Sequence, residues 1–188
     1  MNPQEHTWWL LSRSAGIVAL LLITAATLIG LTLAAGLGGP PQRRKLLVTY
    51  HEQAANAGLT AIGLHGVTLL GDAFLKPGIA GIAIPFAIDY RPVYVATGIA
   101  GGYLAALLGL SFYARRRIGG KRWRKLHRAT PLVYLLALIH TLGAGTDAGS
   151  SWLRAFMLAT AIPAAALLVA RLRKPARPVA NPKGVTSS

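Results

Sequence analysis

The sequence predicts an all-α integral membrane protein, a bundle of about five transmembrane helices with its N-terminus outside and its C-terminus in the cytoplasm. The first observation is that residues 15–37 contain no charged side chain, and a run of this length can cross the ~30 Å hydrocarbon layer. Similar apolar runs recur four more times. The second is that only 13% of the residues are charged, too few to cover a soluble domain of this size.

The apolar runs define one membrane domain, residues 1–174. We expect its helices at residues 8–37, 46–70, 93–114, 126–144 and 151–170. The first run is too long for a cleaved signal peptide and has no basic flank, so we expect it to be retained. Segment 71–92 contains Pro77 and Pro85, which leave room for a short helix but disfavour a full span. Residues 175–188 are rich in proline and polar side chains, and we expect a disordered cytoplasmic tail.

The positive charge predicts the orientation. The net charge is +15, and most basic residues follow the first, third and fifth expected helices. In a five-helix protein these segments lie on one side, which the positive-inside rule assigns to the cytoplasm. Nucleic acid as a partner would explain the charge but not the apolar runs. We therefore expect a multi-pass protein of the cell (cytoplasmic) membrane, with the lipid bilayer as partner and no nucleic acid.

Four of the five histidines form two pairs along the chain. His51 and His65 are fourteen residues apart on the second expected helix, and His127 and His140 are thirteen apart on the fourth. Fourteen residues span ~21 Å with an angular offset of only ~40°, so His51 and His65 point in similar directions at two depths. If the two helices face each other, His51 meets His127 in an inner pair. His65 then meets His140 in an outer pair.

Two imidazoles per pair suit a haem better than a bare metal ion. The chain has no cysteine, so thiolate ligands and iron–sulfur clusters are excluded. Two nitrogens are too few for a structural metal site, but they fill both axial positions of a haem iron. Such an iron has no open position, and its natural work is electron transfer. We therefore predict two haem b groups, with the four histidines as axial ligands of iron and no catalytic residue.

Two features of the helices bear on this interpretation. On a straight helix thirteen residues leave His127 and His140 ~140° apart, so we expect a kink at Pro131, or His127 in the first turn. Arg13 lies within the first apolar helix, where an arginine needs a partner. An outer haem propionate would suit it, and the alternative is that it extends to the outer headgroups.

The histidine spacing resembles that of the ferric reductase-like transmembrane domain, the family of NADPH oxidases, ferric reductases and the haem-binding subunit of methionine sulfoxide reductase. Arg13 and Gly16, in the stretch SRSAGIVAL, are similar to the family's Arg-x-x-Gly. The resemblance covers residues 8–170. It implies that electrons pass from a cytoplasmic-side donor to an extracytoplasmic acceptor. The family often has six helices, so its first would be absent here.

The resemblance also implies partners, because we expect no flavin domain in this chain. The donor would be a cytoplasmic flavoprotein or a quinol, and the chain would be an oxidoreductase component, an electron-transfer subunit that needs partners. The acceptor stays open between ferric iron, oxygen and methionine sulfoxide reductase. One alternative is a small transporter or proton-relay protein that uses the same histidines without haem, with Glu52 in the relay. Another is a structural assembly subunit.

Overall fold

The computed structural model describes residues 3–173, and this part of the chain contains helices and no strand. The helices follow in the order α1 (Pro3–Ala34), α2 (Pro41–Leu69), α3 (Gly78–Ala83), α4 (Pro92–Leu110), α5 (Arg115–Ile118), α6 (Gly120–His127), α7 (Thr130–Ala144) and α8 (Ser151–Arg173). Proline lies in the first turn of α2, α4 and α7, where its missing N–H costs no intrahelical hydrogen bond. The all-helical prediction is therefore confirmed for the described residues.

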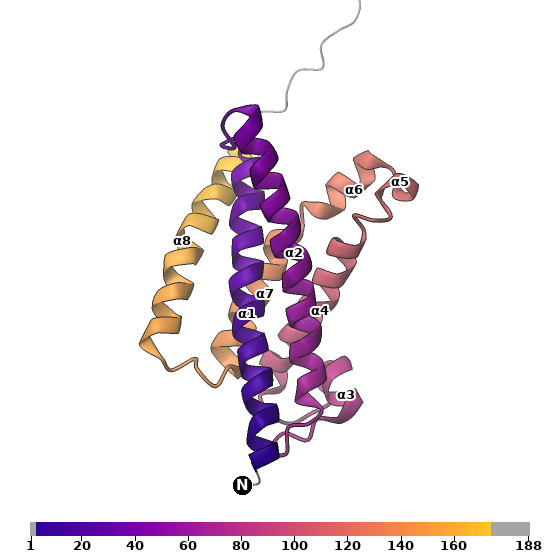
Figure 1. The fold of residues 1–188 in the computed structure, drawn as a ribbon, viewed down its shortest axis with the longest axis vertical. Coiled ribbons are helices and arrows are strands. Elements are labelled where there is room, and N and C mark those ends of the chain that lie inside the picture. Colours follow the sequence, from indigo (N-terminus) through magenta and orange to yellow (C-terminus); the bar gives the residue numbers. More distant parts are fainter. Residues whose placement is uncertain (1–2, 174–188) are drawn as a thin grey trace, which may run out of the picture.

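The long helices form two antiparallel hairpins with α8 beside them (Figure 1). Helix α1 packs along α2, α4 packs along α7, and α8 lies against α1. The two hairpins touch less extensively, and among residues 3–173 the backbones of α2 and α7 hardly approach each other. The space between α2 and α7 is therefore available to side chains from both hairpins.

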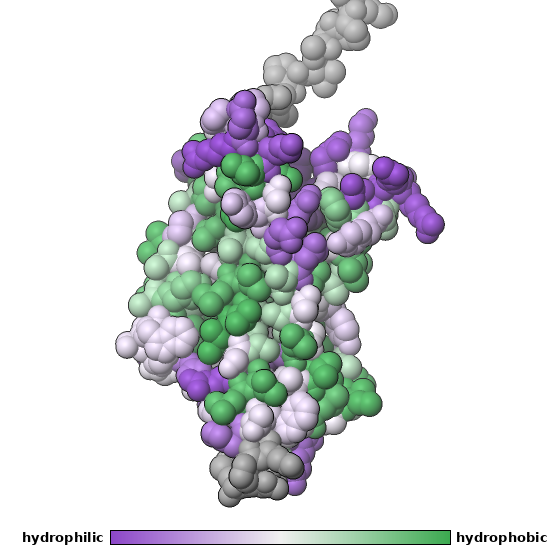
Figure 2. All heavy atoms as spheres, in the orientation of Figure 1, coloured by the Kyte–Doolittle hydropathy of each residue, from purple (hydrophilic) through white to green (hydrophobic). Residues whose placement is uncertain are grey.

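Three helices of the described residues are long and apolar enough to cross a membrane: α1 from His6 onward, α4 and α8. Their large apolar side chains are widely exposed, as Ile162 on α8 and Leu107 on α4 illustrate with 70% and 65% exposure. Figure 2 shows apolar surface around the middle of the molecule and polar surface toward its ends. An exposed apolar belt of this kind is expected where lipid is the solvent.

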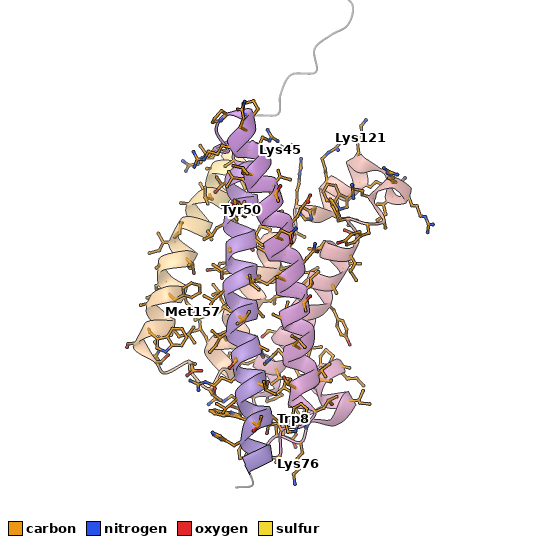
Figure 3. All side chains as sticks on the ribbon, in the orientation of Figure 1. Trp8, Lys45, Tyr50, Lys76, Lys121 and Met157 are labelled. Atoms are coloured by element: carbon orange, nitrogen blue, oxygen red, sulfur yellow. The ribbon has the colours of Figure 1, made fainter. Side chains whose placement is uncertain are left out.

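The basic segments gather at one end of the bundle. The α1–α2 turn, α5, α6 and the end of α8 all lie at this end (Figure 1), which we call the basic end. Figure 3 shows Lys45 and Lys121 there, and Trp8 and Lys76 at the opposite end. The Arg171 guanidinium of α8 donates to the carbonyl oxygen of Arg128 at 3.3 and 3.4 Å, which ties α8 to the connection between α6 and α7.

The expected helix at 126–144 is wrong as a single element. The chain instead ends α6 at His127 and starts α7 at Thr130, with Pro131 in the first turn of α7. The reason is the one that the sequence suggests, because a proline ring inside a continuous helix would collide with the carbonyl four residues earlier. The Thr130 hydroxyl donates to the His127 carbonyl at 3.0 Å and satisfies that group at the break.

The remaining boundaries differ from the expected ones by a few residues, and α4 ends at Leu110 rather than at residue 114. Segment 71–92 contains one short helix, α3, and no span, as the prolines indicate. The expected disordered tail, residues 175–188, lies outside the described residues.

Candidate functional site

The fold brings the four histidines together in the two pairs that the spacing predicts. The ring centroids of His51 on α2 and His127 on α6 are 5.9 Å apart, and the ring planes cross at 90°. The ring centroids of His65 on α2 and His140 on α7 are 6.2 Å apart, with an interplanar angle of 72°. The inner pair lies toward the basic end and the outer pair toward the opposite end, because α2 starts at the basic end.

These separations match those of two imidazoles on one metal ion. Two metal–nitrogen bonds of about 2 Å each, with roughly 1 Å from each nitrogen to its ring centre, place collinear ring centroids about 6 Å apart. The observed 5.9 and 6.2 Å agree with that spacing. Steep interplanar angles are compatible with it, since each ring can turn about its own metal–nitrogen bond.

Hydrogen bonds fix the tautomer of three of the four histidines. Nδ1 of His51 donates to the carbonyl oxygen of Ala26 at 2.8 Å. Nδ1 of His65 donates to the Ser12 carbonyl at 2.9 Å, and Nδ1 of His140 donates to the Tyr94 carbonyl at 2.9 Å. A carbonyl oxygen can only accept, so Nδ1 carries the proton in all three rings. Nε2 is then left with a free lone pair, the state in which histidine ligates a metal.

Each of these three rings also rests on a glycine of the neighbouring helix. A methyl group at Gly16 would lie 3.1 Å from Nδ1 of His65, and one at Gly30 would lie 3.0 Å from Cε1 of His51. A methyl group at Gly98 would overlap the ring of His140, with Cε1 2.6 Å and Cγ 2.8 Å away. The rings therefore fill the space that a side chain would otherwise take.

The glycines and the accepting carbonyls share a spacing. In each case the glycine follows the accepting residue by four positions: Ser12 and Gly16, Ala26 and Gly30, Tyr94 and Gly98. A helical side chain covers the turn N-terminal to its own Cα, so the side chain at the fourth position would shield that carbonyl. Glycine uncovers it. We call each such carbonyl with its glycine a carbonyl–glycine cradle.

His127 is the exception among the four. Its Nδ1 is buried and has no hydrogen-bond partner among the described residues, as is also true of Nε1 of Trp123. The His127 ring instead stacks on the Trp123 indole, with centroids 4.9 Å apart and planes at 24°. The inner pair is thus held by one cradle and one aromatic stack, whereas the outer pair is held by two cradles.

A cavity of about 500 Å³ surrounds the outer pair. Its volume lies within the ~300–1,000 Å³ range of cofactor sites. Besides His65 and His140, its walls include Gly16, Gly98 and the side chains of Arg13 and Asp147. The residues present fit a flat macrocycle here, because two imidazoles whose Nδ1 atoms carry the proton lie with their ring centroids 6.2 Å apart beside an apolar cavity.

Arg13 pairs with Asp147, a partner that the sequence did not indicate. Its Nε and Nη2 atoms donate to the two carboxylate oxygens of Asp147, both at 2.6 Å, and its guanidinium lies 5.3 Å from the ring centre of Trp9. This hydrogen-bonded ion pair holds the pKa of Asp147, in the α7–α8 loop, below its usual range. The pair ties α1 to that loop beside the outer histidines. A contact between Arg13 and a propionate stays a prediction.

An apolar layer separates the two histidine pairs. Gly58 lies midway between His51 and His65 on α2, and Ile23 of α1 packs against it. A methyl group at Gly58 would lie 3.0 Å from Cδ1 of Ile23. Ile23 belongs to a buried cluster with Leu108, Val133 and Tyr134. The Tyr134 hydroxyl shares a hydrogen bond of 2.8 Å with that of Thr160 on α8. Apolar side chains therefore lie at the depth midway between the two pairs.

The sequence interpretation missed several residues of the site. It did not single out Ser12, Gly30, Tyr94, Gly98 or Trp123, because small residues also serve helix packing and tryptophan also suits a membrane interface. One signal was present: Gly16 and Gly30 are fourteen residues apart, the same spacing as His51 and His65. Two antiparallel helices with matching spacings place each glycine opposite one histidine.

Comparison with known proteins adds no relative. No family model, no curated protein and no solved structure matches this chain. The resemblance to the ferric reductase-like domain therefore stays a prediction that rests on the histidine spacing. Within residues 3–173 no three or more His, Cys, Asp or Glu side chains gather in a way that would hold a metal ion. Each histidine pair supplies its two imidazoles alone.

Proposed function

We propose that the chain is a di-haem b transmembrane electron-transfer protein, in which His51 and His127 ligate the inner haem and His65 and His140 the outer one. One observation carries the proposal: two imidazole pairs have centroid separations of 5.9 and 6.2 Å, and three of the four rings are hydrogen-bonded so that Nε2 is free. A satisfied packing histidine needs no partner histidine, and two pairs at two depths are hard to explain by packing alone.

Five helices cross the membrane in this proposal: α1, α2, α4, α7 and α8. Helix α7 has 15 residues, or ~22 Å, so it needs α6 or the interface to complete the ~30 Å crossing. Helix α2 is less apolar because it contains Arg43, Arg44, Lys45 and Glu52. These charged residues all lie in its first half, toward the basic end. By the positive-inside rule, the basic end of this cell-membrane protein would face the cytoplasm, and its N-terminus would lie outside.

A bis-histidine haem, when bound, accepts and returns one electron without binding a substrate. The chain's own residues would do three things. The carbonyl–glycine cradles orient the imidazoles and keep Nε2 unprotonated. The apolar cluster around Ile23 and Tyr134 separates the two sites. The Arg13–Asp147 pair places a balanced charge beside the outer site, where Arg13 has further N–H groups for a propionate.

The direction of transfer and the partners follow from the resemblance. Electrons would enter at the basic end from a flavoprotein or a quinol and leave at the opposite end toward an extracytoplasmic acceptor. The same resemblance leaves open whether that acceptor is ferric iron, oxygen or a methionine sulfoxide reductase. In this proposal the chain is the membrane component of an oxidoreductase.

The direct test is the dithionite-reduced minus oxidised absorption spectrum of the full-length protein, purified in detergent after expression with ample haem. The proposal expects sharp b-type bands and about two haems per chain. A colourless protein would overturn it and would favour a proton relay through the same histidines. In that case, substituting any of the four histidines would alter proton flux in vesicles instead of colour.

A further inference from the structure

His127 is the one candidate ligand without a carbonyl–glycine cradle. The other three rings each donate to a carbonyl and rest on a glycine, whereas Nδ1 of His127 has no partner among residues 3–173. A metal-ligating imidazole with no second hydrogen bond would be free to turn about its Cβ–Cγ bond. Something else must therefore set its orientation.

We propose that Trp123 is the positioning residue of the inner site, and that its indole ring, by stacking, holds His127 toward His51. This inference rests on the proposed di-haem function. Trp123 and His127 are four residues apart on α6, so they are neighbours on one face of the helix. Their ring centroids are 4.9 Å apart with planes at 24°, an offset stack of the kind that aromatic pairs favour.

The indole is itself held in place by a second layer. The ring of Phe112 meets the Trp123 ring at 63° with centroids 6.0 Å apart. The Arg115 guanidinium lies 3.8 Å from the centre of the Phe112 ring, and its Nη1 donates to the Phe112 carbonyl at 2.8 Å. Arg115, Phe112, Trp123 and His127 thus form a continuous series of contacts, one cation–ring, one edge-on and one stacked, from the basic end to the inner site.

The position of Phe112 explains why a stack replaces a cradle here. Phe112 follows Gly98 by fourteen residues, the spacing that separates Gly16 from Gly30 and the two histidines of α2. A fourth glycine would therefore be expected at this place. However, α4 ends at Leu110, so residue 112 lies outside the helix and a large ring occupies it. The carbonyl four residues earlier, that of Leu108, accepts instead from the Ser111 hydroxyl at 2.7 Å. Nδ1 of His127 has no partner among the described residues, and its ring is held by contact with Trp123.

The inner and outer sites therefore differ in how their histidines are held. Both outer ligands are fixed by directional hydrogen bonds, whereas one inner ligand is fixed only by stacking. Loss of the indole ring should therefore release His127 and weaken the inner site alone. Disturbing the hydrogen-bonded surroundings of a metal ligand typically lowers metal affinity 10–100-fold, and we expect an effect of about this size on haem binding to the inner site.

Three variants of the full-length chain test this inference. Trp123→Leu keeps an apolar side chain but removes the ring. Trp123→Phe keeps a ring and removes the indole N–H, which has no partner in the described structure. Trp152→Leu is the matched control, because Trp152 is half exposed at the start of α8. Haem per chain, midpoint potentials and the low-spin EPR signals are measured for each.

We expect about two haems per chain for the wild type, Trp123→Phe and Trp152→Leu. Trp123→Leu should retain about one haem, with the potential and EPR signal of the haem that remains in His127→Ala. That retained haem also shows that the variant is folded. Two haems with wild-type potentials and EPR signals in Trp123→Leu would overturn the inference and leave the proposed function intact. Loss of haem from Trp123→Phe as well, or of both haems from Trp123→Leu, would also overturn it. A wild type without haem would refute the proposed function itself.

Discussion

Gly98→Ala is the smallest change that should disable the outer site. The added methyl group would lie 2.6 Å from Cε1 and 2.8 Å from Cγ of His140, closer than two such atoms can approach. The ring must therefore move by roughly 0.5–1 Å, beyond the ~0.5 Å within which a binding constellation has to be held. The hydrogen bond from Nδ1 to the Tyr94 carbonyl would be strained or lost at the same time. Losing the hydrogen bond that orients a metal-ligating histidine typically lowers metal affinity 10–100-fold, or by about 1.4–2.8 kcal/mol.

The assay measures the haem content per chain and the equilibrium affinity for haem. Helix propensity excludes one other explanation for a loss of haem. Replacing glycine by alanine inside a helix normally stabilises the helix by about 1 kcal/mol, so a loss of haem could not be attributed to a weaker α4. Gly63→Ala is the control, because a methyl group there meets nothing within 4 Å. Gly98→Ala should bind about one haem and Gly63→Ala about two. Full haem content and an unchanged spectrum in Gly98→Ala would refute the cradle.

Two further predictions concern the ion pair and the topology. The folded-state pKa of Asp147 lies below its unfolded value because Arg13 hydrogen-bonds the carboxylate, so the pair stabilises the fold above about pH 4 and this contribution is lost as the pH falls further. Asp147→Asn should lower the melting temperature at pH 7 and make it depend less on pH below 5, as measured by circular dichroism. A variant whose melting temperature still falls steeply in acid would contradict the stabilising role of the Arg13–Asp147 pair. Since the chain has no cysteine, Lys121→Cys and Lys76→Cys each provide a single label site. In intact cells a membrane-impermeant maleimide should label only Lys76→Cys, and labelling of both would exclude the proposed orientation.

The sequence predicts much of the architecture and the histidine pairing. A fourteen-residue spacing on a long helix keeps two side chains on one face, so His51 and His65 had to share a direction whatever the tertiary packing. Pro131 likewise predicts a helix break, because its ring is incompatible with an uninterrupted helix through His127. These are local rules of backbone geometry, and a single sequence carries them in full.

The remaining features depend on tertiary contacts that no local pattern encodes. Arg13 could reach a headgroup, a propionate or a carboxylate with equal ease, and only the fold of the α7–α8 loop brings Asp147 to it. Gly30 is one of 21 glycines, and its role appears only once α1 lies antiparallel to α2. The stacking of Trp123 on His127 could not be predicted from the sequence either, because a tryptophan at this position also suits the membrane interface.

The pairing of the four histidines is tested most directly by comparing the haem content per chain of two double variants. His51→Ala with His127→Ala removes both ligands of the inner pair, whereas His51→Ala with His65→Ala removes one ligand from each pair. The paired geometry predicts about one haem in the first variant and none in the second, although each loses two histidines. Equal haem content in the two variants, or haem that survives in the second, would contradict the claim that these histidines form two separate bis-imidazole sites.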